Sequence, residues 1–150
     1  MVLFTGEFRR NLDDKLRVAI PKRVRGLFKD DDVSACYVAP GTDGSLAIFT
    51  EESFTQLAER LSHAKPTGQN TRAFSRLFYA RAERVEIDSQ GRIRIPNELG
   101  TLAGLTKEVV LIGVRDHLEI WDAGRWDEYL KSQQQNYDAI AEGAFPTDIV

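Results

Sequence analysis

The chain has 150 residues, of which 42% are hydrophobic and 29% are charged, and its formal net charge is −3. These values are typical of a soluble globular protein, and the length allows one ordinary domain or two very small fused units. Because no apolar run approaches the roughly 20 residues that span a bilayer, and the first residues lack the basic region of a secretory signal, we expect a cytoplasmic protein without a membrane partner.

The sequence pattern of residues 1–64 predicts two short strands, a short helix, a strand hairpin and a longer helix. The first two strands are separated by a polar bend, so a hairpin between them is the simplest connection. Pro21 suits the first turn of the short helix, and Thr50 can cap the longer one. In chain order, these elements are expected at residues 4–10, 17–20, 21–28, 35–39, 46–49 and 51–61.

A linker rich in turn-forming residues is expected at 65–70, and a similar series of elements follows in 71–142. Asp122 can cap a final helix that runs from residue 123 into Gln133 or beyond. The last residues, 143–150, are expected to be frayed. Before the final helix, the elements of this half are expected at residues 71–82, 84–88, 92–95, 96–105, 108–114 and 118–121.

The chain contains the same motif twice. Four residues of the first copy recur at one constant offset in the second, namely Asp13, Arg17, Ile20 and Pro21 as Asp88, Arg92, Ile95 and Pro96. Further along, the run 46–49 and the aromatic residues after it are echoed by the run 118–121. Such self-similarity predicts a pseudo-twofold structure in which each half completes a core that the other cannot close alone.

Positive charge is concentrated around the two copies of the motif. Residues 1–28 hold seven Lys or Arg against three Asp or Glu, and residues 65–94 hold the same numbers. In contrast, residues 29–64 and residues 119–150 each hold two against seven. A basic surface at equivalent places on an acidic body is what a phosphate-facing site requires.

The Asp-x-x-x-Arg spacing of the motif predicts a tight turn whose middle residues are exposed at a tip. Gly91 suits such a turn because glycine readily adopts a positive φ. Arginine can contact guanine or phosphate through two parallel hydrogen bonds, glutamine can contact adenine, and lysine can contact the DNA backbone. Two twofold-related tips could enter the major groove together. The candidate contact residues are Lys15, Arg17, Gln90, Arg92 and Arg94.

Other interpretations remain open at this point. Asp13 and Asp88 could serve only to cap the turns and pair with the arginines, in surface ion pairs worth about 0 to 1 kcal/mol. The protein could then be an oligomeric scaffold or interaction protein without DNA binding. An enzyme has the least support, because Cys36 and two histidines provide neither a zinc cluster nor an evident nucleophile set. We therefore expect no catalytic residues, no metal, no cofactor and no small-molecule substrate.

The ordered motifs give the chain a specific resemblance over nearly its whole length. They run from Phe4-x-Gly6-Glu7 and Leu12-Asp13-x-Lys15-x-Arg17-x-x-Ile20-Pro21, through Asp88-Ser89-Gln90-Gly91-Arg92-Ile93-x-Ile95-Pro96 and Ala103-Gly104-Leu105, to Val109-Val110-Leu111-Ile112-Gly113 and Glu119-Ile120-Trp121. In these motifs the chain resembles the MraZ family. That family is similar to the AbrB-like swapped-hairpin regulators, but it fuses two halves in one chain.

The resemblance implies an α+β fold of two tandem AbrB-like swapped-hairpin repeats, which form an intrachain pseudo-dimeric β-barrel with flanking helices. It also implies a nucleoid-associated transcriptional regulator that assembles into a ring-shaped homo-oligomer. Such a regulator binds repeated double-stranded DNA sites upstream of a division and cell wall gene cluster. The DNA contacts would lie in the loops from Asp13 to Arg17 and from Asp88 to Arg92. The first loop departs from the family pattern, because Leu16 stands where Gly is common and resists a positive φ by about 1 kcal/mol or more.

Overall fold

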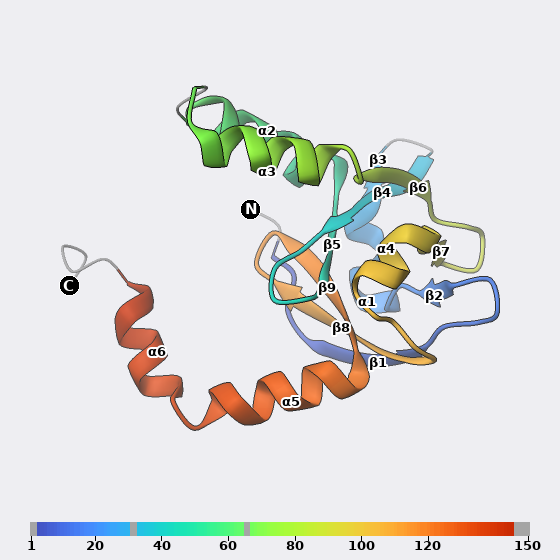
Figure 1. Ribbon diagram of the computed structural model, residues 1–150. Helices are drawn as coiled ribbons and strands as arrows, with labels where there is room; N and C mark the ends of the chain where they lie inside the picture. The colour runs from blue at the N-terminus through green and yellow to red at the C-terminus, as the bar shows by residue number, and fades with distance from the viewer. Residues whose placement is uncertain (1–2, 31–32, 65–66, 146–150) are drawn as a thin grey trace.

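The structure, a computed structural model, describes residues 3–30, 33–64 and 67–145 (Figure 1). Parts of the expected linker and tail, residues 65–66 and 146–150, lie outside the described residues. The strands are β1 Glu7–Asn11, β2 Arg17–Ala19, β3 Lys29–Asp30, β4 Val33–Pro40, β5 Leu46–Phe49, β6 Glu83–Glu86, β7 Arg92–Arg94, β8 Glu108–Val114 and β9 His117–Asp122. The helices are α1 Lys22–Arg25, the 3-10 turn η1 Gly26–Phe28, α2 Glu51–Ser62, α3 Gln69–Tyr79, α4 Asn97–Leu102, α5 Ala123–Gln134 and α6 Tyr137–Ala144.

Most strands join one antiparallel sheet to which both halves of the chain contribute. Its hydrogen-bonded order is β1-β8-β9-β5-β4-β3, and β6 also pairs with β4. Strands β2 and β7 form a separate two-stranded ribbon. One end of the sheet is β1 and the other is formed by β3 and β6 along β4, and these ends do not pair with each other in the described residues, so the sheet is open and the expected β-barrel is not closed. The ends are not joined because β2 and β7, which follow β1 and β6 in the chain, pair with each other as a separate ribbon.

The expected hairpin between the first two strands is also wrong, because each strand pairs with the other half of the chain. Strand β1 is antiparallel to β8, and β2 is antiparallel to β7. The equivalent strand of the second half, β6, pairs with β4 of the first. The chain bends after Leu12, but the strands on either side of the bend, β1 and β2, enter different ladders. Strand β1 pairs along β8, which has three fully buried apolar residues that β1 helps to cover.

A pseudo-twofold axis relates the two halves, and the strand registers locate it. In the β2–β7 ribbon Val18 lies opposite Ile93, which is its own counterpart in the repeat. In the β5–β9 pair Ala47 lies opposite Glu119, again its own counterpart. The axis therefore passes through both pairs and relates the residues on either side of them.

The main core is built jointly by the two halves. Val18 and Ile93 are each 1% exposed, and the isoleucines that follow them in the motif are fully buried. The short helix after each motif adds one inward apolar residue, Val24 in α1 and Leu99 in α4. Because these side chains form one cluster, neither half could bury its share alone.

The longer helices begin at the residues that can cap them. The N–H of Ser53 donates to the Thr50 hydroxyl over 3.0 Å, and the N–H of Arg125 donates to Asp122 over 3.4 Å, so both predicted caps are confirmed. Helix α3 begins at Gln69, two residues earlier than expected. None of the helices in the described residues is long and apolar enough to cross a bilayer.

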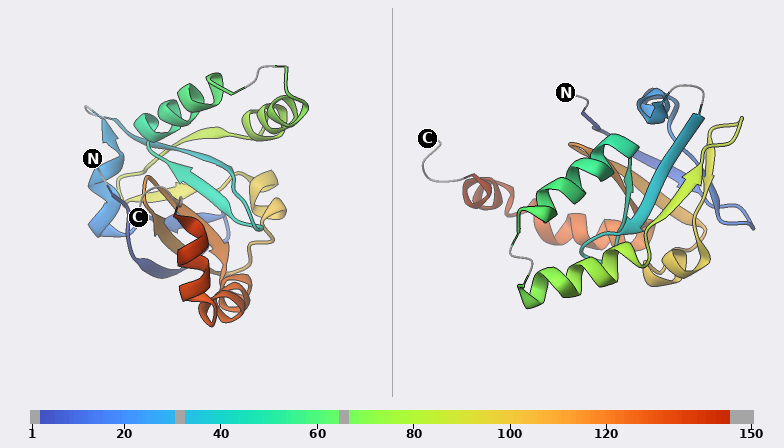
Figure 2. Two further views of the ribbon diagram at one scale, coloured as in Figure 1. Left: turned by 90° about the vertical axis from the view of Figure 1, so that its left-hand side faces the viewer. Right: turned by 90° about the horizontal axis from the view of Figure 1, so that it is seen from above.

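The two halves differ in the helix that follows the capped one. After α2, the capped helix of the first half, α3 returns beside it, and the rings of Phe54 and Phe78 lie 5.9 Å apart. In the second half the chain continues into α6, which the sequence did not predict as a separate helix and which extends away from the sheet (Figures 1 and 2). Among the described residues, the aromatic cluster of Trp121, Trp126 and Tyr129 at α5 therefore has no equivalent of α3 over it.

Replacing Ile93 by Ala should destabilise the whole fold, because the side chain lies on the axis and packs against both halves. We expect the free energy of unfolding to fall by about 2 to 5 kcal/mol, as measured by urea denaturation. The matched control is Arg94→Ala, which changes an exposed neighbour on the same strand and should stay within about 0.5 kcal/mol of the parent. Equal destabilisation by both variants would contradict a shared core at this position.

Candidate nucleic-acid interface

The two motif turns lie at the same end of the molecule, away from α2, α3, α5 and α6 (Figures 1 and 2). In the first turn, one oxygen of Asp13 accepts hydrogen bonds from the backbone N–H groups of Lys15 and Arg17, each over 2.9 Å. The other oxygen accepts the Nε–H of the Arg17 side chain over 2.7 Å. One carboxylate therefore closes the turn and also orients the guanidinium.

The second turn repeats these contacts atom for atom. Asp88 accepts the backbone N–H groups of Gln90 and Arg92 over 2.9 Å, and the Nε–H of Arg92 over 3.0 Å. The N–H of each Asp also donates to the carbonyl oxygen of its Arg, over 3.0 and 2.9 Å. The Asp-x-x-x-Arg motif is thus a structural unit. An arginine four positions after the aspartate lies where the Asp carboxylate can reach both its backbone N–H and its side chain.

The residue before each arginine adopts the left-handed conformation. Gly91 has a φ of 78°, which glycine adopts without strain, and Leu16 has a φ of 59°. The first turn therefore keeps the backbone form of the second despite its departure from glycine. Packing offsets the strain, since Leu16 is partly buried against the main core.

The hydrogen bonds also shift the acidity of the turn carboxylates. The backbone N–H of Arg17, together with the Arg17 side chain and the N–H of Lys15, lowers the pKa of Asp13 to about 2 against the opposing effect of desolvation. The same contacts from Arg92 and Gln90 lower the pKa of Asp88. Both carboxylates are therefore ionised at neutral pH, so each turn holds its arginine by charge as well as geometry.

The arginines of the ribbon face solvent. Because successive side chains of a strand alternate, the buried Val18 and Ile93 place their neighbours on the opposite, outward face. Arg17 lies across from Arg94, and Arg92 lies across from Ala19. The side chains of Arg17 and Arg92 are 34% and 29% exposed.

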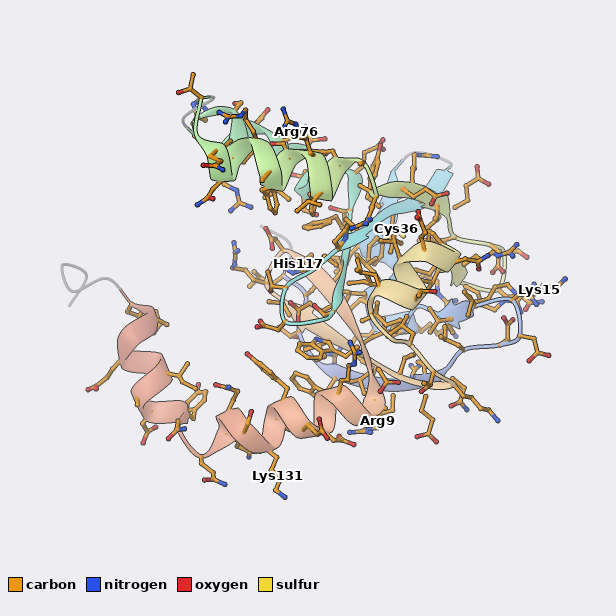
Figure 3. The ribbon with its side chains drawn as sticks, in the orientation of Figure 1. Arg9, Lys15, Cys36, Arg76, His117 and Lys131 are labelled. Carbon is orange, nitrogen blue, oxygen red and sulfur yellow. The ribbon has the colours of Figure 1, made fainter. Side chains whose placement is uncertain are left out.

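The structure brings the two turns within ionic contact of each other. Nη1 of Arg92 lies 4.0 Å from the Asp13 carboxylate of the other turn. Within the described residues, the Nη atoms of Arg17 and Arg92 donate no hydrogen bond, and each side chain is held by its Nε–H. Lys15 and Gln90 are exposed at the tips, and Lys15 points away from the body of the protein (Figure 3). All the predicted site residues thus share one face, which is formed by the turns and the ribbon.

One residue against this face escaped the sequence analysis. Arg25, on the short helix α1, lies against Gly91 of the second turn and donates from Nη2 to the carbonyl oxygen of Ile20 over 2.9 Å. The signal available in the sequence was that Gly100 is the repeat counterpart of Arg25, so a large cation in one half corresponds to a glycine in the other.

Acid should weaken the fold through Asp13. Because its pKa in the folded protein is about 2, below the ordinary value of 3.8, its stabilising contribution is complete above about pH 4 and is lost as the pH falls toward 2. The free energy of unfolding, measured by urea denaturation between pH 2 and 6, should therefore decline less steeply in Asp13→Asn than in the parent. A matching control, Asp14→Asn, changes an exposed residue of the same turn and should leave the slope unaltered. Equal slopes in parent and Asp13→Asn would contradict this assignment.

Comparison with known proteins identifies the family. The family model described as "MraZ protein, putative antitoxin-like" matches twice, over residues 3–77 and 78–147. A protein named "Transcriptional regulator MraZ" from Finegoldia magna is 37% identical over 98% of this chain and all of its own length. Proteins of the same name from Ligilactobacillus salivarius and Pediococcus pentosaceus are 38% and 39% identical, over 98% and 93% of this chain and 100% and 95% of their own lengths. With both repeats matched and nearly every residue aligned, the chain belongs to the MraZ family.

Proposed function

We propose that this protein is a sequence-specific, DNA-binding transcriptional regulator and not an enzyme. The observation that carries the proposal is a pair of turns with the same hydrogen-bond pattern, which hold Arg17 and Arg92 side by side, oriented and partly exposed, around a pseudo-twofold axis. The relatives that cover the whole chain are named as transcriptional regulators, which supports the same conclusion. The coupled turns give a DNA duplex two equivalent points of contact.

In the proposed complex the ribbon and its tips enter the major groove. The Asp13 and Asp88 carboxylates fix each arginine through Nε and leave the Nη atoms for guanine or phosphate, which reduces the entropy lost on binding. Exposed side chains at the tips and on the outward face of β7 add further contacts. The proposed DNA-binding set is Asp13, Lys15, Arg17, Asp88, Gln90, Arg92 and Arg94, in which the aspartates act by positioning.

The proposal extends to the arrangement and targets of the protein. Two AbrB-like swapped-hairpin repeats, residues 1–64 and 71–142, form the intrachain pseudo-dimer, with 65–70 as linker and 143–150 as tail. The exchange of strands between the halves supports this arrangement. We further propose that the targets are repeated double-stranded sites upstream of a division and cell wall gene cluster, and that the protein acts at the nucleoid in the cytoplasm.

The first test removes one arginine of the pair. Arg17→Ala should weaken binding to a duplex carrying tandem upstream repeats by about 5- to 150-fold, the equivalent of about 1 to 3 kcal/mol for one base-reading contact. Binding by the parent should also fall steeply between 50 and 200 mM salt, because phosphate contacts release counterions. Fluorescence anisotropy with labelled duplexes measures both effects.

Lys131→Ala serves as the control, since Lys131 lies on α5 far from the turns (Figure 3). It removes the same charge and should bind DNA like the parent. A folded Arg17→Ala protein with unchanged affinity would contradict the DNA-binding role. Oligomers without salt-sensitive DNA affinity would favour the alternative, an interaction scaffold.

We also propose that the protein forms a ring-shaped homo-oligomer in which α6 of one copy docks on the next copy. A groove of about 530 Å³ lies between α2 and α3 and is lined by Leu61, Tyr79 and neighbouring residues. Helix α6 exposes large apolar side chains that contact little in the described residues, among them Tyr137 at 70% and Ile140 at 45% exposure. A groove and an apolar helix at different places on one chain give a head-to-tail contact that can close into a ring.

Charge complementarity selects a second copy as the occupant. Arg72 and Arg76 line the groove, four residues apart on α3. Asp138 and Glu142 are exposed on α6 with the same spacing of four residues. Residues at this spacing lie on one face of a helix, so the two pairs can meet along antiparallel or crossed helices. Several copies would then present several DNA-binding faces to tandem sites, which raises the overall affinity.

Charge reversal tests the docking contact. Arg76→Glu should lower the mass measured by sedimentation velocity, because it places like charges opposite α6, and combination with Glu142→Arg should restore the parent mass. Lys131→Glu, a reversal on exposed α5, should leave the mass unchanged. A parent that sediments as a monomer, or an Arg76→Glu variant of unaltered mass, would contradict this interface.

A further inference from the structure

The two motif turns are supported from beneath by different residues. A Cβ built on Gly91 would overlap the guanidinium of Arg25, so the guanidinium fills the place of the missing side chain. At the equivalent position of the first turn, Leu16 packs toward Gly100, where an added Cβ would lie 3.6 Å from Leu16 Cδ1. Gly100 is the repeat counterpart of Arg25. At each turn, a large side chain of the first half thus faces a glycine of the second half. The glycine belongs to the turn in one case and to the supporting helix in the other.

Arg25 is held firmly in this place. Its Nη2 donates to the carbonyl oxygen of Ile20 over 2.9 Å, and the N–H of Ile20 donates to the carbonyl oxygen of Gly91 over 2.9 Å. Its Nε is buried and has no hydrogen-bond partner among the described residues. A buried polar atom without a partner is costly, so packing of the guanidinium against the turn must offset this cost.

We propose that Arg25 is a positioning residue for the second turn alone, where it fixes the backbone from which Gln90 and Arg92 reach DNA. This inference rests on the proposed DNA-binding function and assigns part of it to a residue outside the motif. A glycine with positive φ has several other conformations available, and the guanidinium packed on Gly91 excludes them. The first turn needs no such support, because the side chain of Leu16 is itself packed in the core.

The two turns therefore reach the same geometry by opposite means. The first accepts strain at Leu16 and offsets it by apolar packing. The second avoids strain because it has Gly91 at this position, and Arg25 limits the conformational freedom of that glycine. Because the supports are separate, loss of one should disturb one tip and spare the other.

Double-mutant cycles on DNA affinity test this separation. Arg25→Ala should weaken binding of a tandem-repeat duplex by about 3- to 30-fold, and Gln90→Ala should then have little further effect in the Arg25→Ala background. Lys15→Ala, at the tip of the first turn, should keep its full effect in the same background. Leu16→Ala is the matched control, with coupling expected to Lys15→Ala and not to Gln90→Ala. Equal coupling of Arg25 to both tips, or to neither, would overturn the proposal.

A second measurement needs no DNA. The N–H groups of Gln90 and Gly91 donate to Asp88, so their hydrogen exchange, followed by NMR, reports the order of the second turn. Arg25→Ala should speed this exchange at least tenfold and leave that of the Lys15 and Leu16 N–H groups unchanged. Arg25→Lys, which keeps the charge and most of the stem, should show the same speeding, since lysine lacks the planar group that covers Gly91.

Amide hydrogen exchange of the second turn that stays slow in both Arg25→Ala and Arg25→Lys would overturn the role of Arg25, even if DNA binding is intact. Exchange that speeds equally in both turns would overturn it as well. Failure of the parent to bind DNA would instead contradict the proposed function, while the exchange result still decides whether Arg25 orders the turn. The urea midpoint of each variant shows whether the whole fold has been lost, and a globally unfolded Arg25→Lys protein would also count against a role confined to one turn.

Discussion

The exchange of strands between the two halves is the constraint on which the rest of the structure depends. In the described residues, the short strand β2 pairs with β7 of the other half, which is equally short. The pairing buries Val18 against Ile93 on the axis and sets the outward residues of both strands on one face. The proximity of the two turns, and hence of Arg17 and Arg92, follows directly from this pairing.

The structural and functional interpretations of the Asp-x-x-x-Arg motif are not alternatives. Each carboxylate closes its turn by accepting two backbone N–H groups, as a purely structural role requires. The same carboxylate accepts Nε–H of the arginine, and an exposed ion pair of this kind contributes little to stability. What it contributes is orientation, because a guanidinium held through Nε presents its two Nη atoms outward. In the proposed complex, this contact of small energetic value would hold the side chain ready for DNA.

Fusion of the two halves in one chain allows them to diverge. A homodimer would present identical turns, whereas here Lys15 at one tip corresponds to Gln90 at the other. On the outward face of the ribbon, Arg94 has Ala19 as its counterpart. The helices differ as well, since α3 folds back beside α2 while α6 extends from the body (Figure 1). A pseudo-twofold frame with unequal halves has a direction, so it can define an orientation on DNA and a head and tail for assembly.

The sequence by itself determined the features that depend on near neighbours. The turns closed by Asp13 and Asp88, the helix caps at Thr50 and Asp122, and the bounds of β8 all rest on residues a few positions apart, and the structure has each of them. Strand pairing was decided only by the tertiary structure, because the partners of β1 and β2 lie about a hundred and about seventy-five residues away, and local pattern carries no record of them. For the same reason the open sheet and the place of Arg25 beneath Gly91 were missed. The positive φ of Leu16 was foreseen as a difficulty, and only burial against the assembled core resolved it.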